Sequence, residues 1–578
     1  MRFFSLPVCF ALIAASSAGA IPTCCGKDSA ATVAVTAEAS PKSSSQPRAT
    51  NPALPRVDTM RELQSEAIKK QSADWGHWGH IPSRYSTWLN HSNRLIPIYT
   101  FGITLDPLRE EGSVYSDPAR LEKLYGKVPT NTVNPTAAYF DQTDVYRLQK
   151  KAIEQGRKNI ILFVFDGMDW QTTRAAAIYK SGRVGYDTGR GDVLSFQNYR
   201  GTKTDFGYFC TSPRLGGTKF DVNSQVVLGG GKDASGGFNV KRGGAYPWLE
   251  QSNSDYLLGL DRSEPHSVTD SAASAVSMTA GVKTYNGSIN YTVDGEHIVP
   301  IARELQPQGF QIGVVTNVPL SHATPGAAYA NNVARYDYQD IARDMVGLRS
   351  ASHRDHPLQG IDVIISGGWG EGKDKDAAQG DNFAQGNPYF HQTDLHAIDR
   401  KNGGKYTVAQ RTSGVAGRAG LMQGADEAIR QGTRFLGFYG ATGGHLPFQT
   451  ADGGFNPTFD AKGTESYSQA DIDENPTLAD MAEAALKILE KSETGFWLMV
   501  EAGDVDWANH ANNLDNSIGA VLSGEAAFER IVDWVERTQG WDDTAIIVTS
   551  DHGHFLVIDD AEVIAEAGRE DRQAVSTP

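Results

Sequence analysis

The segment at residues 550–554, which follows the apolar run at residues 545–549, carries three side chains that bind metal ions in proteins. Asp551, His552 and His554 lie within four positions of one another. Carboxylate and imidazole groups are ligands that zinc takes in catalytic sites. Buried Asp–His pairs also occur behind metal ligands, as partners that orient them, and this alternative stays open for the segment. The spacing indicates a metal centre.

A second segment offers two further ligands one helical turn apart. Asp506 and His510 are separated by four positions, so on a helix they share one face and can hold the same zinc ion. Glu501, directly after the apolar run at residues 496–500, supplies a hard carboxylate of the kind that suits magnesium. The alternative for this segment is a solvated acidic helix start.

Two other segments add a carboxylate and a hydroxyl group. Asp166 directly follows the apolar run at residues 159–165. Ser271 lies among small residues at a predicted helix start, where free N–H groups and the helix dipole favour an anion, so it is a candidate nucleophile. Taken singly, both segments also fit helix caps, with Asp166 capping a helix that begins near Trp170 and residues 270–271 forming an Asp-Ser cap.

Six apolar, β-prone runs predict the strands that position these groups. They occupy residues 159–165, 311–315, 363–365, 435–439, 496–500 and 545–549. Helical stretches lie between them, the clearest opened by Asn475 as cap and Pro476 in the first turn, with apolar positions spaced by three and four from Leu478 to Leu489. This alternation predicts an α/β fold whose largely parallel sheet is covered on both faces and keeps its site at the carboxyl ends of the strands.

The sequence predicts four parts along the chain. Residues 1–20 combine a basic start, a short apolar run and small residues, as is typical of a cleavable signal peptide, which predicts export to the periplasm, the medium or the cell surface. Residues 21–57 read as a linker rich in Ala, Ser and Pro. Residues 58–150 are predicted to form an N-terminal layer packed on the main domain, which occupies residues 151–578.

Composition and charge exclude several classes of protein. The 578 residues include 53 basic and 69 acidic side chains, a formal net charge of −16, so the chain lacks the general attraction for phosphate backbones that nucleic-acid binding needs. No run of apolar residues is long enough to span a bilayer. The four cysteines provide no disulfide framework, and lipid attachment at Cys24 or Cys25 stays a minor alternative.

Together these segments resemble the motif set of alkaline phosphatases. The matching motifs lie, in order, at residues 160–168, 270–272, 321–325, 500–510 and 549–554. The resemblance implies an α/β fold that is a three-layer α/β/α sandwich with a central, largely parallel sheet. It also implies a secreted, metal-dependent phosphomonoesterase that hydrolyses small phosphate monoesters through a phosphoserine intermediate. Members of the family are commonly dimers, so a homodimer is a further expectation.

The resemblance implies two Zn²⁺ ions, one Mg²⁺ ion and a role for each site residue. Ser271 becomes phosphorylated, and Arg335 binds phosphate through its guanidinium fork, unless it is a surface ion pair. One zinc ion is held by Asp166, Asp551 and His552, and the other by Asp506 and His510. The magnesium ion is bound by Asp166, Thr324 and Glu501. His322 lies next to these ligands without binding the ion.

Two positions depart from the family pattern. Phe165 precedes Asp166 where the family commonly has glycine. The family also takes another histidine for the zinc ion of Asp506 from a later segment, but this chain has no histidine after His554. His445 and His554 are the evident candidates for that ligand.

Three other functions compete with this interpretation. A phosphodiesterase of the same superfamily stays open. A sulfatase is disfavoured, because residues 270–273 lack the Cys/Ser-x-Pro-x-Arg pattern. A non-catalytic phosphate- or metal-binding protein is suggested by the unassigned zinc ligand.

Overall fold

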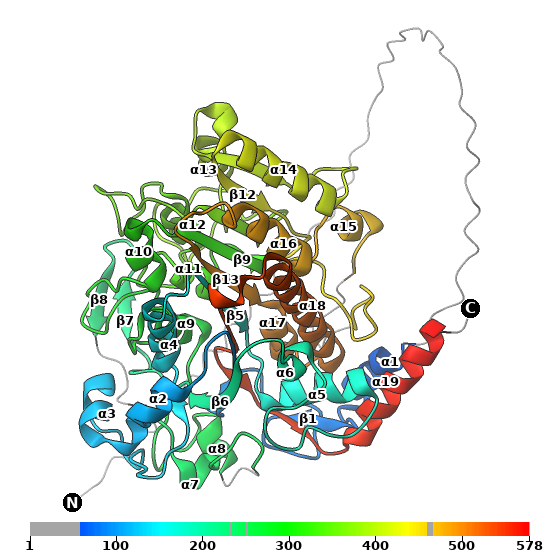
Figure 1. The fold of residues 1–578 in the computed structure, drawn as a ribbon. Helices are drawn as coiled ribbons and strands as arrows, with labels where there is room; N and C mark the ends of the chain where they lie inside the picture. The colour runs from blue at the N-terminus through cyan, green and yellow to red at the C-terminus, as the bar shows by residue number, and fades with distance from the viewer. Residues whose placement is uncertain (1–57, 230–233, 235, 250–252, 459–465, 577–578) are drawn as a thin grey trace, which may run out of the picture. The chain divides into compact units, whose positions relative to one another are not determined.

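A ten-stranded sheet forms the centre of the computed structural model, which describes residues 58–576 apart from 230–233, 235, 250–252 and 459–465 (Figure 1). Its strands follow the order β11-β12-β10-β9-β13-β5-β14-β3-β6-β4. The seven strands from β11 to β14 are parallel, and β3 runs antiparallel to both of its neighbours. In sheet order, the strands span Tyr406–Gln410, Arg434–Phe438, Val363–Gly367, Gln311–Pro319, Phe496–Ala502, Asn159–Phe165, Thr544–Thr549, Ile96–Phe101, Thr204–Cys210 and Phe140–Asp141.

Helices cover both faces of this sheet, and each face has its own apolar core. Alternate side chains of β5 enter the two cores, because successive residues of a strand point to opposite faces. One core includes side chains of α1 (Thr59–Lys70), α5 (Trp170–Ser181), α14 (Gly417–Gln431), α16 (Leu478–Leu489), α18 (Leu514–Thr538) and α19 (Ala561–Ser576). The other includes side chains of α4 (Thr143–Glu154), α9 (Ser271–Ala280), α10 (Ile301–Leu305), α11 (Ala323–Ala327) and α12 (Tyr338–Val346). The predicted three-layer α/β/α architecture is confirmed.

The six apolar runs of the sequence are strands of this sheet, namely β5, β9, β10, β12, β13 and β14. The predicted helix between β12 and β13 is α16, but its predicted cap is wrong. Thr477 caps the helix, because its side chain and that of Asp480 accept each other's backbone N–H in a capping box. Asn475 instead bonds the backbone of Gly440.

Residues 58–150 contribute to the main sheet as well as to its surroundings. Strands β3 and β4 come from this stretch, while α1 packs against α19 near the other end of the chain. Two short antiparallel pairs join the same stretch to later residues: β1 (Gly76–Trp78) pairs with β16 (Leu556–Ile558), and β2 (His91–Ser92) pairs with β15 (Gly553–His554).

The predicted signal peptide, the predicted linker and the Cys24-Cys25 pair lie outside the described residues. Within the described part of the chain, no helix is both long enough and apolar enough to cross a membrane.

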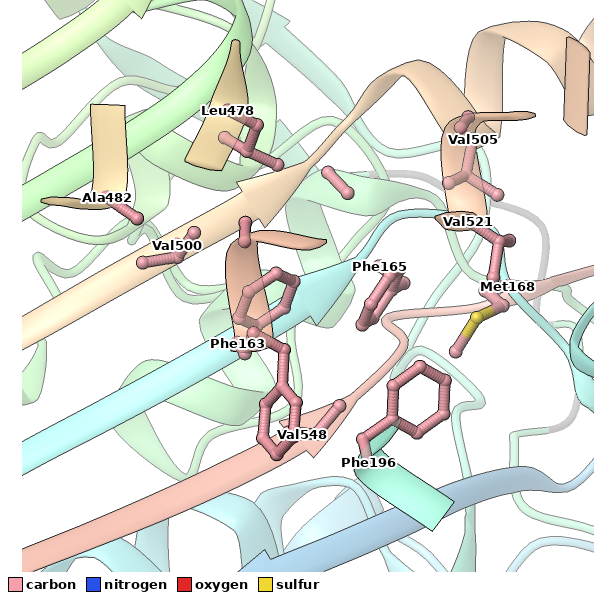
Figure 2. Close-up of a cluster of buried hydrophobic side chains, with 14 of the residues drawn as sticks. Phe163, Phe165, Met168, Phe196, Leu478, Ala482, Val500, Val505, Val521 and Val548 are labelled. Atoms are coloured by element: carbon pink, nitrogen blue, oxygen red, sulfur yellow. The ribbon is translucent and has the colours of Figure 1, made fainter. Parts of the chain in front are cut away.

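Phe165, which departs from the motif pattern, is a core residue at the end of β5 (Figure 2). Its ring stacks on Phe163, with centroids 4.8 Å apart, and contacts Phe196 at 5.2 Å. Gly524 of α18 lies against this ring, and a Cβ atom there would come within 2.3 Å of Phe165 Cε1. The absence of a side chain at Gly524 of α18 therefore leaves room for the ring of Phe165.

Candidate functional site

The carboxyl ends of β5, β13 and β14 bring three acidic residues to one edge of the sheet. Asp166 follows β5, Glu501 lies near the end of β13, and Asp551 comes shortly after β14. These strands are direct neighbours with β5 in the middle, and Val164 of β5 stands opposite both Glu501 and Thr549. Loops at this edge of a parallel sheet form its functional site.

Asp166, Asp551 and His552 form a buried group with ligand atoms within 4.8 Å of one another. His552 Nε2 lies 3.2 Å from Asp166 Oδ1 and 3.5 Å from Asp551 Oδ2. The helix that follows Asp166 is capped by Asp169, whose side chain accepts the N–H of Thr172. Asp166 is therefore not used as the cap of that helix and faces the group of ligands.

Ser271 faces the same group from the first turn of α9. Its Oγ lies 3.2 Å from His552 Nε2, and the residue is almost fully buried. Asp270 caps α9 by accepting a hydrogen bond from the N–H of Ala273, and it accepts another from Nη1 of Arg335 at 3.0 Å. Ser271, the start of a helix and a guanidinium group thus lie next to one another.

A second buried group lies beside the first and consists of His91, Asp506, His552 and His554. Asp506 belongs to α17 (Asp504–His510), and its Oδ1 is 2.9 Å from Nε2 of His554 and 3.4 Å from Nε2 of His510. His91 Nε2 lies 3.6 Å from the same oxygen and 3.1 Å from His510 Nε2.

Glu501 and Thr324 lie at the third side of the site. Glu501 accepts a hydrogen bond from Thr316 of β9, and Thr324 Oγ1 lies 3.5 Å from Asp166 Oδ2. Thr316 is a contact that the sequence motifs did not indicate, because it belongs to a strand rather than to a loop.

Burial and mutual repulsion disfavour the charged forms of two carboxylates in the site. Burial, followed by the charges of Asp551 and Asp506, raises the pKa of Asp166 well above its usual range. Burial likewise raises the pKa of Glu501 to about 8, with further contributions from Asp551 and Asp506. Burial also acts to raise the pKa of Asp506, but His510 and the other histidines around it hold it well below its usual range.

Two carboxylate oxygens of the site, Asp166 Oδ1 and Glu501 Oε1, are buried and receive no hydrogen bond. A buried charge that receives no hydrogen bond is costly, so such oxygens in a cluster of carboxylates and imidazoles fit divalent metal ions.

His445 and His322, two histidines singled out in the sequence, lie outside both groups of ligand atoms. His445 stacks on Phe448 at 4.3 Å and contacts Trp507 at 5.0 Å, and its Nδ1 lies 2.5 Å from its neighbour's carbonyl oxygen, Leu446 O. His322 stacks on Tyr338. The structure brings His91 to the site instead, a residue that carried no metal-ligand motif in the sequence.

Comparison with known proteins gives one consistent family. The family model described as "Alkaline phosphatase" matches residues 250–564. Alkaline phosphatase 4 of Bacillus subtilis is 26% identical over 310 residues, which cover 52% of this chain and 54% of the relative. The alkaline phosphatase of Escherichia coli is 27% identical over 304 residues, which cover 52% and 61%.

A solved structure of Thermus thermophilus alkaline phosphatase is 24% identical, covers 69% of this chain and 60% of its own, and has a TM-score of 0.42. The chain thus matches less than two thirds of the length of each of these proteins. His91 and Asp166 lie ahead of the region that the family model matches.

Proposed function

Because the chain belongs to the alkaline phosphatase family, we propose that it is an exported phosphomonoesterase that hydrolyses phosphate monoesters through a phosphoserine at Ser271. The observation that carries the proposal is the position of Ser271 Oγ, 3.2 Å from His552 Nε2 and next to the buried group of Asp166, Asp551 and His552. A hydroxyl group at a helix start beside a cation site has the surroundings of an activated nucleophile.

The residues fit two zinc ions and one magnesium ion. Asp166, Asp551 and His552 would hold one zinc ion, Asp506 and His510 would bind the other, and Asp166, Thr324 and Glu501 would hold magnesium. Bound divalent ions lower the pKa of a coordinated hydroxyl group and offset the charge of phosphoryl oxygens.

The protein's own groups orient the substrate. The first N–H groups of α9 and the guanidinium of Arg335 favour a phosphate dianion next to Ser271. Asp270 holds Arg335 in place through their 3.0 Å ion pair. The bond from Ser271 Oγ to phosphorus forms as the bond to the leaving alcohol breaks; the serine loses a proton and the alcohol gains one. Water then cleaves the phosphoserine and releases inorganic phosphate.

Hydrolysis of an aryl phosphate near pH 9, measured with and without a chelator, tests the proposal. We expect Ser271→Ala to abolish the burst of phosphorylated enzyme and to lower kcat by about 100-fold or more, because the covalent route is lost. Ser277→Ala is the matched control on the same helix, since its hydroxyl bonds only to backbone carbonyls, most closely to that of Ala273.

Equal phosphate release by the wild type and Ser271→Ala contradicts the covalent mechanism, and full activity after removal of the metals contradicts the metal assignment. The matching diester and sulfate, assayed in parallel, separate a monoesterase from a phosphodiesterase. Tight phosphate binding without turnover indicates a binding protein.

A further inference from the structure

We propose that His91 is the third side-chain ligand of the metal site formed by Asp506 and His510, so that the segment at residues 76–94 completes the site. The inference rests on the proposed function, because it assigns a ligand within the same metal centre. It concerns a residue that lies ahead of the region matched by the family model.

The hydrogen bonds of His91 and His510 turn the Nε2 atoms of the two rings toward each other. Nδ1 of His91 lies 2.8 Å from the carbonyl oxygen of Thr269, and Nδ1 of His510 lies 2.5 Å from that of Leu89. A carbonyl oxygen only accepts, so each Nδ1 donates a hydrogen, and Nε2 is the nitrogen of each ring that can bind a metal ion. The two Nε2 atoms are 3.1 Å apart. This separation allows both atoms to contact one ion.

The distances among the three ligand atoms match a tetrahedral zinc site. With Zn–N and Zn–O bonds of about 2.0–2.1 Å, ligand atoms of a tetrahedron lie about 3.3 Å apart. The three separations in this group are 3.1 Å between His91 and His510, 3.4 Å between His510 and Asp506, and 3.6 Å between His91 and Asp506. One ion can therefore contact all three atoms with small adjustments.

The two histidines expected from the sequence fit this position less well. His554 Nε2 is 2.9 Å from Asp506 Oδ1, which is a hydrogen-bond distance and suits a residue that orients the carboxylate. His445 stacks on Phe448, and its Nδ1 lies 2.5 Å from the carbonyl oxygen of Leu446.

The segment that carries His91 is fixed to the strand ends at several points. His91 stands opposite His554 in the β2–β15 pair, and Gly76 stands opposite Ile558 in the β1–β16 pair. The buried Arg94 donates to Asp169 Oδ2 at 3.0 Å and to the carbonyl oxygen of Leu556 at 2.6 Å. These contacts hold His91 beside the strand ends that carry the other ligands.

The position of His91 also connects the metal centre to the nucleophile. Its imidazole stacks on His552, with centroids 3.6 Å apart, and its Nδ1 bonds the carbonyl group two residues before Ser271. Such partners fix the orientation of neighbouring ligands as well as that of the ring itself.

Zinc content per chain, measured by elemental mass spectrometry on the purified full-length protein, tests the inference. We expect two zinc ions in the wild type and one in His91→Ala, with at least about 10-fold weaker binding of the second ion in chelator competition. His77→Ala is the matched control: His77 lies in the same segment and is at least as buried, but it pairs with Asp559. It should keep two zinc ions.

A double variant guards against a general loss of structure. If His91 and Asp506 share one ion, Asp506→Ala and the double variant His91→Ala/Asp506→Ala should each keep one zinc ion, and the remaining ion reports an intact first site. The inference is overturned if His91→Ala still binds two zinc ions. It is also overturned if Asp506→Ala keeps one zinc ion and the double variant keeps none. Neither outcome contradicts the proposed function. A wild type that binds no zinc overturns the proposed function and this inference with it.

Discussion

Arg335 is connected to the nucleophile through a single carboxylate. Asp270 accepts a hydrogen bond from the guanidinium at 3.0 Å and two more from the backbone N–H groups of Ala273 and Gly287. Burial acts to lower the pKa of Arg335, but Asp270, Tyr336 and Tyr338 together outweigh it, so the net pKa is raised and the group stays charged. Its Nε is buried and donates no hydrogen bond. A charged group with a spare donor beside Ser271 suits a phosphate oxygen.

Replacing this guanidinium should weaken phosphate binding without affecting the metals. A hydrogen bond to a charged group contributes about 1.5–3 kcal/mol, so Arg335→Ala should raise the inhibition constant of inorganic phosphate by about 10- to 100-fold. Zinc content should be unchanged. The exposed Arg349, 4.0 Å from Asp355, provides the control variant Arg349→Ala. Unchanged phosphate inhibition in Arg335→Ala would remove this residue from the site.

The end of β5 carries both a core residue and a site residue. Phe165 fills the space beside Gly524 of α18, and Asp166, the next residue, faces the ligand group. The two residues are joined by one peptide bond, so a shift of Phe165 would move the backbone that carries Asp166.

Adding one methyl group to α18 tests this coupling. Gly524→Ala should lower the free energy of unfolding by about 1–3 kcal/mol, because the new Cβ overlaps Phe165. The displaced strand end should also weaken metal binding. In urea unfolding, Gly420→Ala is the matched control in helix α14, where a Cβ has 3.4 Å to its nearest neighbour, and it should be neutral or stabilising by up to about 1 kcal/mol. Equal free energies of unfolding of the two variants would contradict this coupling, because α18 would then accommodate the methyl group without loss of stability.

Across the whole molecule, a net charge of −16 surrounds a site that is proposed to bind an anion. Four of the acidic residues, Asp166, Glu501, Asp506 and Asp551, converge there. Three divalent ions would add about six positive charges to these four negative ones, and Arg335 one more. The metals would thus make the site locally positive in an acidic protein, and removing them should expose the repulsion among the carboxylates.

The metal-free protein should lose stability as the pH rises from about 7 to 9. The folded-state pKa of Glu501 is raised from 4.5 to about 8, so its contribution is fully present below pH 4.5 and is lost as the pH rises through 8. This group alone should cost about 1.4 kcal/mol over that interval. The pKa values of His510 and His554 are lowered from 6.5, so these two groups change the free energy of unfolding mainly below pH 7.

Thermal unfolding of metal-loaded and metal-stripped protein at both pH values measures the effect. The loaded protein should lose less stability, and stripped Glu501→Gln should lose less than stripped wild type. Glu525→Gln, a buried glutamate paired with Lys180, is the control. Identical pH dependence in stripped wild type and stripped Glu501→Gln would contradict this account.

The sequence by itself determined the α/β class, the six strands and the carboxylate and imidazole side chains at their ends. It could do so because strand and helix periods are local, and because the carboxyl ends of parallel strands meet at one edge. For the same reason Asp506 and His510, one helical turn apart, were predicted to share a face. The cap of α16 was misassigned because two polar residues on either side of Pro476, Asn475 and Thr477, are both suited to that role.

Only the tertiary structure brought His91 to the site. It lies 419 residues from His510 in sequence, in a short strand whose own residues carry no metal motif. Its position depends on the pairing of β2 with β15 and on the burial of Arg94, which are contacts between segments far apart in the chain. Local sequence spacing cannot predict these contacts, because they depend on how the whole sheet and its loops pack together.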